Sequence, residues 1–273
     1  MEPSRLSVPT LSLSRDLRRA LARARALGVR GVEIDGRRGI AAEQITQTGL
    51  RQIRKWLDDE GLVVSAVAFP TRGGYADADR LEARIAATKS ALELAHALGA
   101  QVVTNHIGDI PPAPVPDADE PEPGWQLLID VLADIGCWGQ RVGATLCAEA
   151  GRAAPADLLR VIAALPEVSL QCDIVTGSLL VHRHDPVAAV ETLGAHIGFV
   201  HVTDAVAGSY AGRGRPAPLG TGEVDVPAVF GALEERAYRG WIGLEAADES
   251  ASMAELATAI GFLGGRAGDS IGP

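Results

Sequence analysis

Cysteine and aromatic residues are scarce in this sequence. The three cysteines, Cys137, Cys147 and Cys172, include no pair with CxxC spacing. An odd number of cysteines without paired spacing argues against a disulfide framework and fits a reducing compartment, so we expect a cytoplasmic protein. Aromatic residues make up only 4% of the chain, and alanine, leucine, valine and glycine must therefore fill the core.

Long hydrophobic runs and an excess of positive charge are also missing. No run approaches the roughly 18 apolar residues of a membrane-spanning helix. The first residues, Met1–Arg5, lack the apolar segment of a secretory signal. The net charge of −10 argues against a surface that binds nucleic acid or anionic lipid. We therefore expect a protein that acts on a small molecule, with a homo-oligomer left open.

Eight apolar runs, rich in β-branched residues, alternate with amphipathic segments along the chain. Such runs are typical of strands buried in a parallel sheet, and the segments between them are typical of helices. The predicted strands are Leu6–Leu11, Gly31–Asp35, Val63–Phe69, Gln101–His106, Ala144–Glu149, Val168–Ile174, Ile197–Thr203 and Trp241–Ala246. The predicted helices are Asp16–Leu27, Glu43–Asp59, Asp77–Leu98, Trp125–Gln140, Ala156–Ala164, Pro186–Leu193, Pro227–Arg236 and Met253–Leu263.

This alternation predicts an α/β protein with a closed (β/α)8 barrel, the TIM barrel. The alternative, an open doubly wound sheet, would require a glycine-rich phosphate turn after the first strand, and Pro9–Ser12 contains no glycine. The length of 273 residues suits one domain over residues 1–273, with 264–273 as a flexible tail. The proline-rich loop Ile110–Gly124 and the glycine-rich loop Ala205–Val224 are candidate lids.

Four of the predicted strands end on residue types that bind divalent metal ions. These residues are Glu149, Asp173, His201 and Glu245. The C-terminal ends of barrel strands meet at one mouth, and the last four strands are neighbours, so we expect these side chains to share one ion. Three carboxylates and one imidazole suit Mn²⁺ or Mg²⁺ best, with Co²⁺ and Zn²⁺ as alternatives.

Other polar residues near the predicted mouth are candidates for substrate binding. Glu33 lies in the second predicted strand, and His106 ends the fourth. Arg213 and Arg215, in the glycine-rich loop, either reach over the mouth to a substrate oxygen or serve only solubility. Asp204 either orients the histidine of the seventh strand or caps the turn that follows.

At these residues the chain resembles the xylose-isomerase-like TIM-barrel superfamily, which includes sugar isomerases and epimerases, dehydratases and apurinic-site endonucleases. The motifs that carry the resemblance are Val200–Asp204, Leu219–Asp225, Gly240–Glu245, Cys147–Glu149 and Gly31–Ile34. The resemblance implies that the four strand-end residues are the family's metal ligands. Two positions depart from the epimerases. This chain has Thr176 where the epimerases commonly have a histidine, and Ala207 where they commonly have a substrate-binding arginine.

The resemblance implies a metal-dependent isomerase or epimerase of a sugar or related α-hydroxycarbonyl compound. Glu149 and Glu245 would remove a proton and return one, through an enediolate. One alternative is a dehydratase of a cyclic keto-polyol, such as inosose or dehydroshikimate, which needs the same metal and base. Another is an inactive barrel that serves as a binding subunit, which the departure at Thr176 keeps open. The acidic chain argues against the endonuclease branch.

Overall fold

Eight parallel strands form a closed barrel in a computed structural model that describes residues 5–112, 123–166, 169–247 and 252–269. The strands follow the order β1-β10-β7-β6-β5-β4-β3-β2 around the barrel. They are β1 (Leu6–Pro9), β2 (Gly31–Asp35), β3 (Val63–Ala68), β4 (Val102–Asn105), β5 (Thr145–Ala150), β6 (Gln171–Val175), β7 (Ile197–Val202) and β10 (Trp241–Leu244). The predicted (β/α)8 barrel is confirmed.

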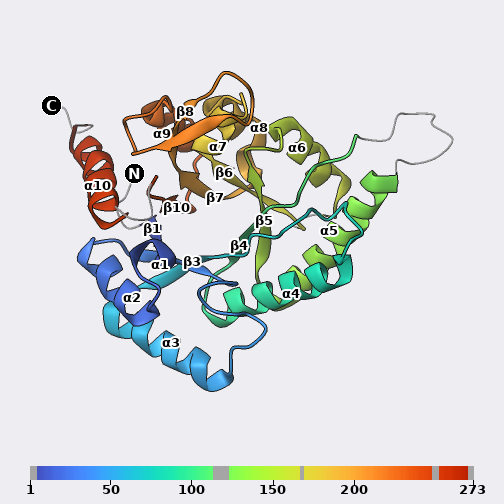
Figure 1. Cartoon of the computed structure of the whole chain (residues 1–273), viewed down its shortest axis with the longest axis horizontal. Coiled ribbons are helices and arrows are strands. Elements are labelled where there is room, and N and C mark those ends of the chain that lie inside the picture. Colours follow the sequence, from blue (N-terminus) through green and yellow to red (C-terminus); the bar gives the residue numbers. More distant parts are fainter. Residues whose placement is uncertain (1–4, 113–122, 167–168, 248–251, 270–273) are drawn as a thin grey trace.

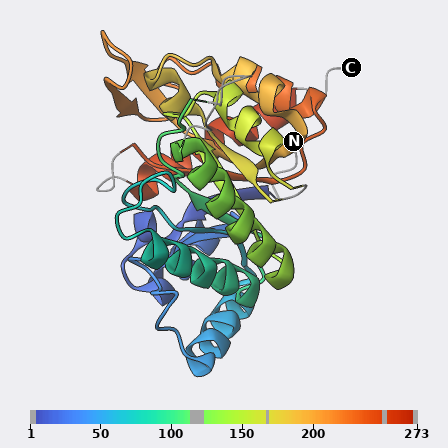
Figure 2. The same ribbon diagram turned by 90° about the vertical axis from the view of Figure 1, so that its right-hand side faces the viewer.

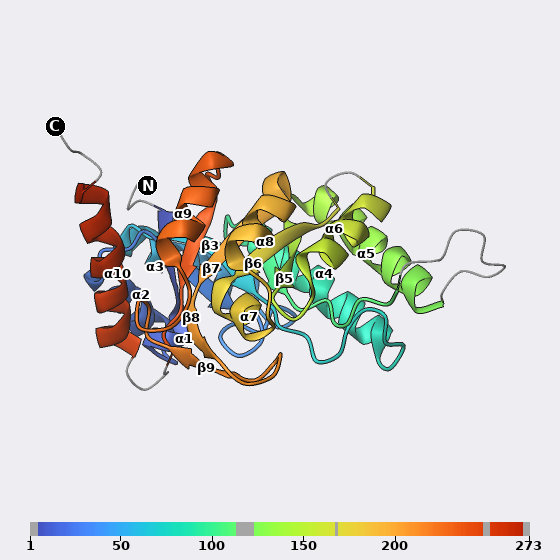
Figure 3. The same ribbon diagram turned by 90° about the horizontal axis from the view of Figure 1, so that it is seen from above.

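Helices surround the strands, as Figures 1 and 3 show. The longer ones are α2 (Leu17–Ala26), α3 (Gln47–Glu60), α4 (Leu81–Ala97), α5 (Pro123–Val142), α6 (Pro155–Ala164), α8 (Pro186–Leu193), α9 (Val226–Glu235) and α10 (Ser252–Asp269). Shorter helical turns are α1 (Thr10–Leu13), α7 (Thr176–Val181) and the 3-10 turn η2 (Gly194–His196). Within the described residues, none of the helices is both long and apolar enough to cross a membrane.

Alternate residues of each strand face either the barrel interior or the helices. The small interior cluster consists of Ala66, Val102, Cys147 and Phe199. The strand residues between them belong to the larger core that the helices cover, and Leu146 and Ala148 of β5 are examples. Cys147 therefore faces inward, as the sequence predicted, and this orientation fixes the face on which Glu149 lies.

Two segments differ from the sequence prediction. Part of the loop Ala205–Val224 forms an antiparallel hairpin (orange in Figure 2) of β8 (Asp204–Ala207) and β9 (Gly214–Ala217). Its glycine and proline content hid the strand signal. The last helix, α10, continues to Asp269, although the sequence predicted a flexible tail from residue 264. Residues 113–122 of the proline-rich loop and Val168 of the sixth predicted strand lie outside the described residues.

Candidate active site

A cavity of about 410 Å³ opens at the C-terminal ends of the barrel strands. The four predicted metal ligands all line it, and so do the two strand-end candidates for substrate binding. These six residues are Glu33, His106, Glu149, Asp173, His201 and Glu245. Arg213 and Arg215 are exposed in and beside the β8–β9 hairpin and are not among the residues that line the cavity.

His201 occupies the centre of this group. Its Nδ1 lies 2.8 Å from Oδ2 of Asp173, and its Nε2 lies 2.8 Å from Oε2 of Glu33. Oε1 of Glu245 is 3.9 Å from the same Nε2. His201, Asp173 and Glu33 are buried, whereas the Glu245 side chain is 43% exposed. The imidazole thus joins carboxylates from three other strand ends.

A residue of the same strand and one of the neighbouring strand β10 fix the position of the His201 ring. The Phe199 ring lies 4.8 Å from it, centroid to centroid, and Phe199 belongs to the apolar interior cluster. Gly243 of β10 pairs with His201, and a Cβ at this position would lie 2.8 Å from Cδ2 of the imidazole. Such a distance is too short for any side chain, so glycine is required beside the histidine.

Two strand irregularities lie at the acids that contact His201. The pairing of β2 with β3 shifts between Val32 and Glu33, and the pairing of β6 with β7 shifts between Cys172 and Asp173. The extra residue is in the partner strand in both cases, Ser65 of β3 and Gly198 of β7. Each register shift therefore lies opposite an acid that contacts His201.

The charges of this group shift the pKa values of its members. Burial lowers the pKa of His201, but the charges of Asp173 and Glu33 and their hydrogen bonds outweigh burial and raise it well above the ordinary value. Burial raises the pKa of Asp173, and the adjacent His201 counteracts part of that effect. Protonated His201 is therefore the form that these acids stabilise in the absence of a metal ion.

A second pair lines the same cavity, where Nδ1 of His106 is 2.8 Å from Oε2 of Glu149. The hydrogen bond to Glu149 raises the pKa of His106, against a lowering by burial. Burial raises the pKa of Glu245, which His201 partly offsets. Among the carboxylates of the cavity, Glu149 lies on β5 and Glu245 directly follows β10, and β6 and β7 separate these two strands.

The donor set at the mouth fits a divalent ion. Glu33, His201 and Glu245 each offer one ligand atom, and these atoms lie within 4.8 Å of one another. Asp173 contacts the other ring nitrogen of His201, and Glu149 pairs with Asp173 in the β5–β6 register. The structure therefore brings the four predicted ligands to one cavity, but of these four only His201 and Glu245 belong, with Glu33, to the group whose ligand atoms lie close enough to share an ion among the described residues. Carboxylate oxygens with one imidazole suit Mn²⁺ or Mg²⁺.

The sequence pattern of the family described as "Xylose isomerase-like TIM barrel" matches residues 21–264. The chain belongs to this family. A search of curated proteins gives no match. Among solved structures, the xylose isomerase domain protein from Planctomyces limnophilus is 20% identical with a TM-score of 0.83, and the match covers 96% of each chain.

Two further solved structures share the fold. An L-ribulose 3-epimerase is 21% identical with a TM-score of 0.73, and the match covers 96% of this chain and 93% of that one. A probable 3-DHS dehydratase from Bacillus anthracis is 14% identical with a TM-score of 0.73, and the match covers 95% of this chain and 98% of that one. At these identities the likeness shows the xylose-isomerase-like barrel fold alone.

Thr176, which stands where epimerases of this family commonly have a histidine, has a structural role. Its side chain is buried, its Oγ1 donates to the carbonyl oxygen of Thr203 at 2.5 Å, and it accepts from the Thr203 N–H at 2.9 Å. Thr176 thus links the end of β6 to the end of β7, and it does not line the mouth cavity.

Asp204 binds the loop that follows it. Its carboxylate accepts hydrogen bonds from four backbone N–H groups, those of Ala205, Gly220, Gly222 and Val224. A Cβ at Gly222 would lie 2.2 Å from Oδ1 of Asp204, so the close approach of this backbone requires glycine. Of the two roles considered for Asp204, the structure shows the one in the turn; the partner of His201 is Asp173.

Sequence reasoning missed Asp35 and Arg38, which also line the mouth of this xylose-isomerase-like barrel. A signal for Asp35 was present, because residues two apart in a strand share a face and Asp35 follows Glu33 by two. Arg38 gave no signal, since it lies in a turn after β2 whose direction depends on contacts that the local sequence does not show.

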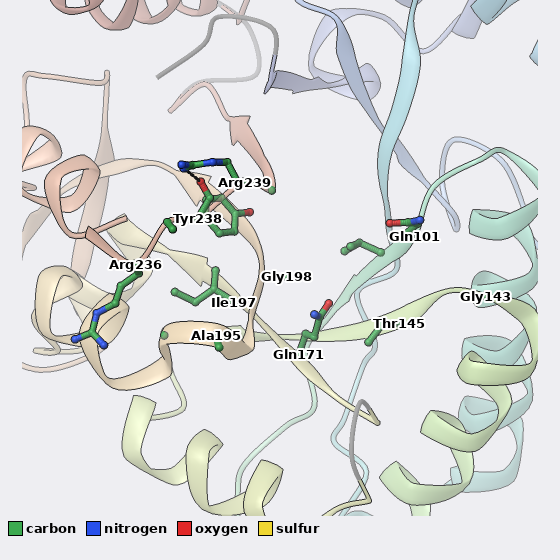
Figure 4. Close-up of a pocket in the computed structure, with 14 residues that line it drawn as sticks. Gln101, Gly143, Thr145, Gln171, Ala195, Ile197, Gly198, Arg236, Tyr238 and Arg239 are labelled. Atoms are coloured by element: carbon green, nitrogen blue, oxygen red, sulfur yellow. Dashed lines mark hydrogen bonds between the residues drawn. The ribbon is translucent and has the colours of Figure 1, made fainter. Parts of the chain in front are cut away.

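A second cavity, of about 460 Å³, lies at the opposite end of the barrel (Figure 4). It is bordered by residues at the N-terminal ends of the strands, among them Gln101, Thr145 and Gln171, and by Arg236 and Arg239 near β10. None of the described residues that line it is an acid or a histidine. It therefore offers no carboxylate or imidazole ligand for a divalent ion among the described residues, and the mouth is the candidate active site.

Proposed function

We propose that this protein is a divalent-metal-dependent isomerase or epimerase of a sugar or a related α-hydroxycarbonyl compound. The observation that supports it most is that Glu149 and Glu245 line one cavity with His201 between them in the strand order. The similarity of the fold to an L-ribulose 3-epimerase is consistent with this activity. The family to which the chain belongs supports the same reaction class.

His201, Glu245 and Glu33 would hold the ion, because their ligand atoms lie within 4.8 Å of one another, and Glu149 lines the same cavity. The ion would act as a Lewis acid on the substrate carbonyl and so make the neighbouring C–H more acidic. His201 must give up its proton to become a ligand, since a metal binds the neutral imidazole. Asp173 then orients the ring from Nδ1, as second carboxylates do for metal-binding histidines.

The two glutamates perform the proton transfers. One carboxylate removes the proton from the carbon next to the carbonyl, which leaves an enediolate, and the other returns a proton to the other face or to the adjacent carbon. His106 donates to Glu149 and so holds that carboxylate at the cavity wall.

A dehydratase is the second candidate, because the fold is also similar to a probable 3-DHS dehydratase. The same residues would remove the proton, and a β-hydroxyl would then leave as water. An inactive barrel finds less support, since Thr176 has a buried structural role while the proposed acid–base residues are all present in one cavity.

We also propose that the enzyme works in the cytoplasm on a small-molecule substrate. The described cysteines, Cys137, Cys147 and Cys172, are all free, which fits a reducing compartment. The net charge of −10 disfavours nucleic acid as a partner.

The test is a panel of ketoses incubated with the Mn²⁺-loaded enzyme in deuterated water and followed by NMR. The proposal predicts deuterium at the carbon next to the carbonyl, together with an isomeric or epimeric sugar. A dehydratase would instead give an unsaturated product that absorbs in the near ultraviolet. No exchange and no product from any ketose, with metal bound, would contradict the proposed activity.

A further inference from the structure

The turn after β2 is held tightly to the mouth. Oδ1 of Asp35 accepts hydrogen bonds from the N–H groups of Arg37 and Arg38, at 2.8 and 2.6 Å. The carbonyl oxygen of Asp35 accepts from Gly39 and Ile40, at 3.1 and 2.8 Å. Ile40 is buried in the core. The turn is therefore fixed before any ligand arrives.

The guanidinium of Arg38 is held by the same acid. Its Nε donates to Oδ2 of Asp35 at 2.9 Å, and within the described residues no other hydrogen bond of this guanidinium is formed. The Asp35 side chain is 8% exposed, whereas that of Arg38 is 69% exposed. A buried carboxylate thus anchors an arginine whose terminal N–H groups remain available at the cavity.

Arg38 is the only lysine or arginine among the described residues that line the mouth. Five carboxylates line the same cavity, those of Glu33, Asp35, Glu149, Asp173 and Glu245. The Asp35–Arg38 pair has no net charge, so it offers hydrogen-bond donors without attracting an anion. The remaining acids would repel a phosphate or carboxylate group on a substrate.

Arg38 lies at the outer rim of the mouth. It is on a turn beyond the end of β2, and its side chain is 69% exposed, whereas the side chains of Glu149 and Glu245 are 22% and 43% exposed. A substrate whose reacting carbons lie near the two glutamates would therefore present a more distant part of its chain to Arg38.

We propose that Arg38, positioned by Asp35, is a specificity-determining residue that donates hydrogen bonds to a hydroxyl oxygen of the substrate remote from the reacting carbons. The substrate class is accordingly an uncharged polyhydroxy carbonyl compound rather than a sugar phosphate or a keto acid. This inference rests on the proposed function, because it assigns the substrate of the same site.

The test compares Arg38→Gln with Arg37→Gln, a matched control. Arg37 is the adjacent residue, but its guanidinium lies over the Phe69 ring, 4.3 Å from the centroid, and it does not line the mouth. KM and kcat are measured on a neutral ketose and its phosphate ester, and calorimetry gives the Kd of the ketose without turnover. Asp35→Asn and Arg38→Lys test whether the fixed position matters.

We expect Arg38→Gln to raise KM and Kd for the neutral ketose about tenfold, with kcat within about twofold of the wild type. KM and Kd of Asp35→Asn and Arg38→Lys should lie between those of the wild type and Arg38→Gln. Each of these variants keeps a donor group at position 38 but loses the hydrogen bond from Nε of Arg38 to Oδ2 of Asp35. Arg37→Gln should match the wild type. The wild-type kcat/KM for the phosphate ester should be at least about tenfold lower than for the ketose.

Equal KM and Kd for Arg38→Gln and Arg37→Gln would overturn the inference, as would a preference for the phosphate ester or no binding of any neutral ketose. A wild type that binds a ketose without converting it would contradict the proposed function alone. The Kd comparison would then still decide the role of Arg38.

Discussion

Nε2 of His201 lies 2.8 Å from Oε2 of Glu33, although 168 positions separate the two residues in the sequence. Their strands, β7 and β2, are not neighbours in the barrel, so this contact spans the mouth. It places a fourth acid beside the three acids and the histidine that the sequence predicts as metal ligands. Glu33 was predicted to bind substrate, and its position next to the imidazole makes its effect on metal binding measurable.

Glu33→Gln should weaken Mn²⁺ binding by about tenfold or more. As a ligand, Glu33 would contribute a charged oxygen; as a neighbour of His201 it would orient the ring, and loss of such a partner typically costs about 10- to 100-fold in affinity. Calorimetric titration of Mn²⁺ into the chelator-treated protein measures this. Unchanged affinity, with normal folding by circular dichroism, would place Glu33 outside the metal site.

Glu149→Gln and Glu245→Gln should each lower kcat by at least about 1,000-fold with saturating Mn²⁺, because each removes a proton-transfer group. Turnover with the ketose converted best by the wild type measures this, after metal analysis has verified that the ion is bound. Glu235→Gln, which changes an exposed glutamate of α9, is the control and should keep full activity. Near-normal rates in both site variants would contradict the mechanism.

The metal-free protein should lose stability as the pH rises above neutrality. The charges of Asp173 and Glu33 raise the pKa of His201 in the folded state well above its ordinary value of 6.5, despite burial. Its contribution is thus fully present below that value and is lost as the pH rises through the folded-state pKa. The free energy of unfolding should fall by up to about 1.4 kcal/mol per pH unit in this window.

Urea unfolding with a chelator, between about pH 6 and pH 9, measures this slope. The His201→Gln variant is the control, and it should lack that part of the slope whatever its absolute stability. If the free energy of unfolding depended on pH equally in the wild type and in His201→Gln, His201 would not bind an extra proton in the folded state.

Asp204→Ala should destabilise the protein by about 2–4 kcal/mol, because four backbone N–H groups lose their acceptor next to a buried position. Asp225→Ala is a matched comparison. Its carboxylate accepts only from Ala228 as the N-cap of α9, at 3.1 Å, and its loss should cost about 1 kcal/mol. Equal losses in thermal or urea unfolding would contradict the role assigned to Asp204.

The sequence predicted the features that follow from local patterns. The barrel follows from eight apolar runs with helices between them, and the ends of those runs identify Glu149, Asp173, His201 and Glu245 as mouth residues. The inward orientation of Glu149 in β5 was predictable in the same way, because Cys147 and Glu149 are two residues apart and therefore share a face of the strand.

The features that were missed depend on contacts between distant segments. The contact of Glu33 with His201 crosses the mouth, and the register shifts opposite Glu33 and Asp173 are not revealed by any local pattern. For Arg213 and Arg215 the sequence left two roles open, reaching over the mouth to a substrate oxygen or serving only solubility. The β8–β9 hairpin positions both outside the cavity, and Arg38 lies there instead.

The most direct test of the account is a crystal structure of the Mn²⁺-loaded protein with anomalous diffraction at the manganese edge. The account predicts one strong peak at the barrel mouth, within coordination distance of His201 and Glu245 and of carboxylates from Glu149, Asp173 or Glu33. A mouth without an anomalous peak at saturating Mn²⁺, or a peak only at another place in the chain, would contradict it.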